Sequence, residues 1–203
     1  MIPDIIIDLG FIHTSVVELI AVIFGLASVW LVKKESVWGF PVGAVNVLIY
    51  VFICFSAKLY AYAGINVFYF LMGMYGLYNW IRKTGSDDHI PITRCRPGER
   101  WIYVGLILVF FAMLYLMLKR FTDSTVPVWD SVTTSIYIIA MWLMARKRIE
   151  HWLLWIIGDL ISIWLFAYEQ LFFSSFQYMV FTVIALLGWR EWRKKIRVLI
   201  PGQ

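Results

Sequence analysis

Residues 142–168 read WLMARKRIEHWLLWIIGDLISIWLFAY, a cluster of three cations followed by an apolar stretch that holds one acidic residue, Asp159. The apolar part, 152–168, has about the length of a helix that crosses the ~30 Å hydrocarbon core of a bilayer. Six further apolar stretches lie along the chain, at 14–32, 37–56, 59–81, 101–118, 131–145 and 174–192. The sequence therefore predicts an all-α integral membrane protein with seven transmembrane helices.

The composition excludes an ordinary soluble domain. Hydrophobic residues make up 62% of the 203 residues and charged residues only 15%, whereas a soluble domain has roughly half and about a quarter, respectively. The net charge of +5 does not indicate a nucleic-acid partner, because the Lys and Arg residues lie in short clusters between the apolar stretches. The lipid bilayer is the expected partner instead.

Motifs of catalysis and metal binding are missing from the sequence. It has no Gly-rich phosphate-binding loop ending in Gly-Lys-Ser/Thr and no His-Glu-x-x-His zinc motif. The two cysteines, Cys54 and Cys95, form neither a disulfide framework nor a metal-ligand pattern. We therefore expect no enzymatic activity, no cofactor and no bound metal, which leaves binding and permeation.

The cations indicate an orientation in the membrane. With seven spans, 15 of the 18 Lys and Arg residues fall on one side, and the other side holds only Lys58, Lys119 and Arg120. Cytoplasmic loops carry the excess of cations in membrane proteins. We therefore expect a multi-pass protein of the bacterial inner membrane with its N-terminus outside and its C-terminus in the cytoplasm.

Two parts of the chain resemble each other. Residues 76–80 (GLYNW) and 188–192 (GWREW) share a Gly-x-x-x-Trp pattern that runs into cations. Upstream, Trp38 follows one cation pair as Trp152 follows another cation cluster. This pattern predicts a duplicated three-helix unit, although Gly-x-x-x-Trp before cations is also an ordinary way for a span to end.

The duplication predicts four parts: a first three-helix repeat at 14–81, a cytoplasmic loop at 84–99, a linker helix at 101–118, and a second three-helix repeat at 131–192. A single linker helix gives both repeats the same orientation, so this is a 3+1+3 parallel repeat. Carriers built from parallel repeats bind their substrates near the midplane between the repeats. We expect the substrate site there.

Polar residues inside the spans are the candidates for that site, since each is costly in lipid without a partner. Asp159 lies roughly 10 Å inside its span, and Asn46 lies at a similar depth. A carboxylate there would suit a cationic or hydroxyl-rich ligand. The alternatives are a carboxylate bonded to another helix or protonated, and an asparagine that joins two helices.

Further candidates come in pairs. Asn66 and Tyr69 lie one turn apart and would present an amide and a phenol to the same side. Trp152 and Trp155 have the same spacing and would offer flat faces to a ring, especially a cationic one. Gln177 and Tyr178 complete the set of candidate binding residues. For the tryptophans, Gln177 and Tyr178 the alternative is the interfacial belt of a membrane protein.

Five stretches resemble the PnuC family of vitamin-precursor transporters: 38–46, 57–60, 66–69, 76–80 and 145–159. The resemblance implies three helices, a linker helix and three more, similar to a full-length version of the SWEET transporters. It also places the family's Asn-x-x-Tyr motif on Asn66 and Tyr69 and its Trp-x-x-Trp motif on Trp152 and Trp155. Trp189 and Trp192 have the same Trp-x-x-Trp spacing.

The resemblance further implies a substrate and a mechanism. The substrate would be nicotinamide riboside, with thiamin or riboflavin as alternatives, and it would cross by facilitated diffusion. A cytoplasmic kinase would trap it by phosphorylation without implied direct contact. An alternative of another class is a substrate-capture subunit of a larger energy-coupled importer. The oligomeric state stays open, including a homo-oligomer.

Overall fold

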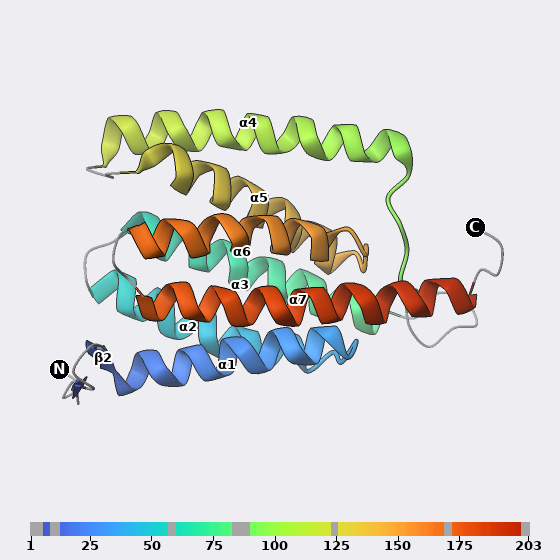
Figure 1. The fold of residues 1–203 in the computed structure, drawn as a ribbon, viewed down its shortest axis with the longest axis horizontal. Helices are drawn as coiled ribbons and strands as arrows, with labels where there is room; N and C mark the ends of the chain where they lie inside the picture. The colour runs from blue at the N-terminus through green and yellow to red at the C-terminus, as the bar shows by residue number, and fades with distance from the viewer. Residues whose placement is uncertain are drawn as a thin grey trace. The chain divides into compact units, whose positions relative to one another are not determined.

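The computed structural model describes residues 6–8, 13–56, 60–82, 90–122, 126–168 and 172–199. These residues form seven α-helices, as the sequence predicts (Figure 1). The helices are α1 (Val16–Lys33), α2 (Gly39–Ser56), α3 (Tyr60–Ile81), α4 (Pro97–Phe121), α5 (Pro127–Ala145), α6 (His151–Tyr168) and α7 (Phe172–Leu199).

Two short strands, β1 (Ile6–Asp8) and β2 (His13–Ser15), precede the first helix. They pair antiparallel, with Ile7 opposite Thr14. The all-α prediction did not include them. Their β-branched residues favour an extended backbone, and α1 begins directly after β2.

The fourth and fifth helices begin several residues before the apolar stretches that predict them. The linker helix begins at Pro97 rather than at residue 101, because proline fits the first helical position and the Glu99 carboxylate accepts a hydrogen bond from the Arg96 N–H at 2.9 Å. The loop predicted at 84–99 therefore ends at Arg96, and its residues 84–89 lie outside the described residues. The fifth helix begins at Pro127 rather than at 131, so it is not a short span.

Four of the described helices are long and apolar enough to cross a membrane: α2, α4, α5 and α6. Only 6% of the most apolar part of α4 is buried, whereas 56% of the most apolar part of α5 is buried. Large apolar side chains such as Leu108 and Val109 on α4 are exposed. Such an apolar surface suits contact with lipid, because the backbone polar groups of a helix are bonded within the helix and need no water.

The first compact unit comprises residues 1–89, in which α2 packs against both α1 and α3. The Ser28 hydroxyl of α1 donates a hydrogen bond to the Gly39 carbonyl oxygen at 2.8 Å. The Phe40 ring of α2 packs against Gly76 of α3, and it meets the Trp80 ring edge to face at 5.0 Å. Because Gly76 has no side chain, the Phe40 ring can pack directly against the backbone of α3.

The second compact unit comprises residues 90–203, in which α4 lies along α5, α5 packs on α6, and α6 packs on α7 (Figure 1). The Trp152 ring of α6 packs against Gly188 of α7 and meets the Trp192 ring edge to face at 5.7 Å. The last part of α7, with its cations, runs on past the turn between α5 and α6 (Figure 1).

The α1–α2 turn and the α5–α6 turn have the same hydrogen bonds at positions 112 residues apart. Glu35 and Lys147 both have a left-handed backbone, with φ of 59° and 54°. The residue after each donates its N–H to a carbonyl five residues back, at 2.9 Å in both turns. Each helix therefore ends in a Schellman motif, with a charged residue where glycine is usual.

The segment before α4 is bound to the α5–α6 turn of its own unit by backbone hydrogen bonds. The Thr93 N–H donates to the Lys147 carbonyl oxygen at 3.1 Å, and the Ile149 N–H donates to the Thr93 carbonyl oxygen at 3.0 Å. The Lys147 ammonium donates to the Ile90 carbonyl oxygen at 3.0 Å. We call residues 90–96 the strap.

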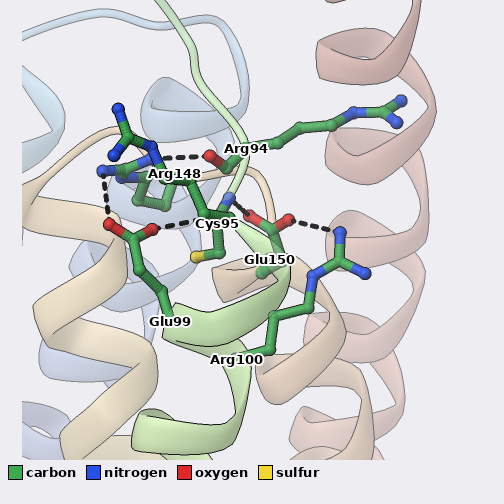
Figure 2. A network of polar contacts seen from close by, with 7 residues as sticks. Arg94, Cys95, Glu99, Arg100, Arg148 and Glu150 are labelled. Atoms are coloured by element: carbon green, nitrogen blue, oxygen red, sulfur yellow. Dashed lines mark hydrogen bonds and ion pairs between the residues drawn. The ribbon is translucent and has the colours of Figure 1, made fainter.

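Ion pairs reinforce the strap (Figure 2). The Glu150 carboxylate accepts a hydrogen bond from the Cys95 N–H at 3.0 Å and pairs with Arg100 at 3.4 Å. Arg148 donates to the Arg94 carbonyl oxygen at 2.6 Å and pairs with Glu99 at 3.6 Å. Burial and the neighbouring Glu150 carboxylate raise the pKa of the Cys95 thiol to about 12.

Candidate functional site

Most hydroxyl groups of α5 are bound within the helix. Ser131 donates to the Pro127 carbonyl oxygen at 2.6 Å, and Thr133 donates to the Trp129 carbonyl oxygen at 2.9 Å. Such bonds to the preceding turn remove the need for a partner on another helix. Tyr137 is different, because its phenol is too long to bond to its own turn and reaches α6 instead.

Tyr137 forms a buried polar network with α6. Its hydroxyl donates a hydrogen bond to the Asp159 carboxylate at 3.1 Å. The same oxygen lies 2.9 Å from the Ser162 hydroxyl. The phenol hydroxyl has one hydrogen to donate, so while Tyr137 donates to Asp159, Ser162 must donate to Tyr137. The hydrogen bonds thus run from Ser162 through Tyr137 and end at the carboxylate.

Aromatic rings flank the same phenol. The Trp155 ring of α6 is stacked on the Tyr137 ring at 5.0 Å, and the Tyr178 ring of α7 is nearly parallel to it at 6.5 Å. Phe166 is stacked on Tyr178 at 5.2 Å. Three helices therefore contribute flat rings around one carboxylate, an arrangement that suits a flat and cationic ligand ring.

Gly158 fixes the position of the Tyr137 ring. A Cβ added at Gly158 would overlap the ring of Tyr137, so only glycine allows this close approach between α5 and α6. The glycine directly precedes Asp159 on α6. Gly158 therefore makes room for the Tyr137 ring, and the next residue, Asp159, accepts the hydrogen bond from the Tyr137 hydroxyl.

Asp159 is 2% exposed, and among the residues that the structure describes its polar partner is Tyr137. Neither α5 nor α6 contains a Lys or Arg, and the cations of α7 begin at Arg190. Asp159 lies eight residues into α6, which is about 12 Å by helical rise. A carboxylate at this depth is expensive without a counter-charge.

Three residues of the predicted site, Trp155, Asp159 and Tyr178, gather around Tyr137. Gln177 precedes Tyr178 on α7 and is half-buried. We name Tyr137, Trp155, Asp159 and Tyr178 the Tyr137 cluster. A role of Gln177 in substrate binding stays a prediction.

Trp152 is also in this unit but is packed differently. It is 1% exposed and lies between His151, Trp192 and the backbone of Gly188. These are the contacts of a core residue. Its role in substrate binding stays a prediction.

The predicted residues of the first unit lie on α2 and α3. The Asn46 amide donates to the Ala21 carbonyl oxygen of α1 at 2.6 Å, so this amide joins two helices. Asn66 and Tyr69 lie one turn apart on α3 and are both half-buried, as their spacing predicts. The Tyr69 ring is tilted against the ring of Phe68 at 5.8 Å.

Sequence reasoning missed Tyr137 and Ser162. One signal could have found Tyr137: it lies in the middle of a span, whereas tyrosines of the interfacial belt lie near the ends. Ser162 lies one turn after Asp159 on α6, the spacing of side chains that share a helix face.

Comparisons with known proteins identify the class. Residues 15–194 match the family described as nicotinamide mononucleotide transporter. The nicotinamide riboside transporter PnuC of Escherichia coli (strain K12) is 31% identical over 94% of this chain and 90% of its own length. The riboflavin/roseoflavin transporter RibM of Streptomyces davaonensis is 26% identical over 91% of this chain and 90% of its own.

A solved structure supports the fold. The chain is similar to the crystal structure of the vitamin B3 transporter PnuC, with a TM-score of 0.72 and 21% identity over 90% of this chain and 82% of that one. The chain therefore shares the fold of that structure. The chain belongs to the nicotinamide mononucleotide transporter family, as its PnuC-like motifs predict.

Proposed function

We propose that the protein transports nicotinamide riboside across the bacterial inner membrane. The observation that carries this proposal is the Tyr137 cluster, in which Trp155 and Tyr178 flank a phenol bound to a buried carboxylate. Nicotinamide riboside has a flat, cationic pyridinium ring, for which ring faces and a carboxylate are suitable partners. The relatives named as nicotinamide riboside transporters support the same substrate.

Facilitated diffusion is the mechanism that we propose. An inside-negative membrane potential favours entry of a cation by ~2.3 kcal/mol per 100 mV. Phosphorylation by a cytoplasmic kinase would then trap the substrate inside. The resemblance to the PnuC motifs supports this mechanism, and it requires no ion gradient and no ATPase.

The proposed architecture is a 3+1+3 parallel repeat, similar to the SWEET transporters, with the N-terminus outside. Its support is the constant offset of 112 residues between equivalent features. Phe40 and Trp152 occupy equivalent places, each on a glycine and edge to face with a tryptophan of the next helix. The turns at Glu35 and Lys147 have the same offset. We further propose that Asn66 and Tyr69 contribute to substrate binding.

Riboflavin is a second candidate substrate, because RibM aligns with almost the whole chain. It has flat fused rings that would also stack on Trp155. It lacks the positive charge that the Asp159 carboxylate would complement, so we rank it below nicotinamide riboside.

Uptake into liposomes that contain only the purified protein tests the proposal. We expect saturable uptake of labelled nicotinamide riboside without ATP, and stronger competition by unlabelled nicotinamide riboside than by riboflavin. Uptake that appears only after an added ATPase would instead identify a subunit of an energy-coupled importer. Stronger competition by riboflavin or thiamin would reassign the substrate.

A further inference from the structure

Among the described residues, no cation on α5 or α6 balances the negative charge that Asp159 carries when it is ionised. The residue is 2% exposed, and the polar partner of its carboxylate among the described residues is the neutral Tyr137 hydroxyl. No Lys or Arg lies on α5 or α6, and the strap, with its cations, is bound to the turn that precedes α6. The missing counter-charge must come from a proton or from a bound cation.

The hydroxyl groups next to Asp159 can stabilise its ionised form when they point toward it. Ser162 donates to Tyr137 and Tyr137 donates to Asp159, so two hydroxyl dipoles point toward the carboxylate. A hydrogen bond donated to an ionised acceptor is stronger than one between neutral groups. The network thus stabilises the negative form of the acid and presents it next to the Trp155 and Tyr178 rings.

We propose that Asp159 selects substrates by charge: it favours flat rings that carry a positive charge over neutral rings of the same shape. This inference rests on the proposed function and assigns the preference to one carboxylate. Trp155 and Tyr178 would bind either kind of ring by stacking, whereas Asp159 would distinguish them. Tyr137 and Ser162 are positioning residues in this scheme, since they act through the carboxylate.

Two ligands that differ by one hydride provide the test. Nicotinamide riboside is cationic, and its 1,4-dihydro form is neutral and of almost the same size. We would measure the dissociation constants of both ligands by calorimetry, for the parent protein and for Asp159→Asn, which keeps the shape of the side chain.

We expect the parent protein to bind the cationic form at least about tenfold more tightly than the neutral form. In Asp159→Asn the affinity for the cationic form should fall about 10- to 100-fold, while the neutral form binds as before. Unchanged binding of the neutral form also shows that the variant is folded. Asp130→Asn, at the start of α5, is the matched control and should keep the parent ratio.

The outcomes separate the two proposals. If the parent protein binds no nicotinamide riboside, the proposed function and the charge selection both fail. If the parent binds it but Asp159→Asn keeps the same preference, the charge selection alone is overturned. Equal affinity of the parent for both ligands would also overturn it, and that result needs no variant to fold.

Discussion

In the α1–α2–α3 unit an aromatic ring of α2 packs on a glycine of α3, and in the α5–α6–α7 unit a ring of α6 packs on a glycine of α7. Both rings meet a tryptophan edge to face one turn further along the partner helix, at Trp80 and at Trp192. Both units turn through a charged residue with a left-handed backbone. At the helix ends the units are built in the same way.

At mid-helix the two units differ. The second unit places Tyr137, Trp155 and Asp159 together, and the positions 112 residues before them in the first unit are Gly25, Gly43 and Val47. The first unit uses Gly43, one turn into α2, to bring α1 and α2 close, where it faces the Ser28 hydroxyl. The two units thus share the ring-on-glycine contacts of Phe40 and Trp152, which we call the common frame. The second unit alone has the polar and aromatic groups of the Tyr137 cluster, which suit a ligand.

The largest effect should come from removing the rings of the common frame. We expect Trp152→Ala and Phe40→Ala each to lower the free energy of unfolding by ~3–5 kcal/mol, because each leaves a cavity beside a glycine. Thermal unfolding in detergent would show it. Trp38→Ala is the control: Trp38 is 67% exposed, and a change of at most ~0.5 kcal/mol is expected. Equal losses for Trp38 and Trp152 would contradict this frame.

A smaller effect should separate two glycines. Gly158→Ala would force its Cβ into the Tyr137 ring and should cost ~1–3 kcal/mol together with loss of transport. At Gly64 of α3, nothing in the described residues lies within 4 Å of an added Cβ. There alanine should stabilise the helix by ~0.5–1 kcal/mol. If Gly158→Ala and Gly64→Ala both raised the unfolding temperature, the close approach of α5 and α6 would be refuted.

Trp155→Ala should weaken binding with little change in stability. We expect the dissociation constant for nicotinamide riboside to rise about 5- to 30-fold, since stacking and cation–π contacts contribute ~1–2 kcal/mol. Trp164→Ala is the matched control, because Trp164 lies on the same helix and is exposed. If the two variants bind alike in calorimetry, the Tyr137 cluster is not the ring-binding site.

The smallest effect concerns the strap and leaves binding unchanged. Because burial and Glu150 raise the pKa of Cys95 from an ordinary 9.0 to about 12, its thiolate fraction at neutral pH is far below that of a free thiol. In a Cys54→Ser background, maleimide labelling should be slow and should keep accelerating above pH 9. Burial is the main cause of the raised pKa, and the Glu150 charge adds to it. Glu150→Gln removes that second contribution, so labelling should be faster. A labelling rate that levels off near pH 9 would contradict a bound strap.

Much of the fold and part of the site could be predicted from the sequence. Apolar length gave the seven helices, because a span must match the hydrocarbon core. Asp159 and Trp155 were identifiable because a charge and a paired ring stand out within an apolar stretch. The structure places both of them against Tyr137.

The rest depended on partners that sequence does not reveal. From the sequence, Asn46 could be a ligand-binding amide or one that joins two helices, and only the structure shows its hydrogen bond to Ala21. Trp152 and Trp155 share one motif, yet one is packed on Gly188 and the other on Tyr137. Sequence similarity also matched Trp38 with Trp152, whereas the shared contacts match Phe40 with Trp152.

The most direct test is an experimental structure of the protein with nicotinamide riboside bound. We expect density for the pyridinium ring against the Trp155 face, with the Asp159 carboxylate as the nearest charged group. A ring bound away from both residues, for example held only by α1, α2 and α3, would contradict a binding site at the Tyr137 cluster.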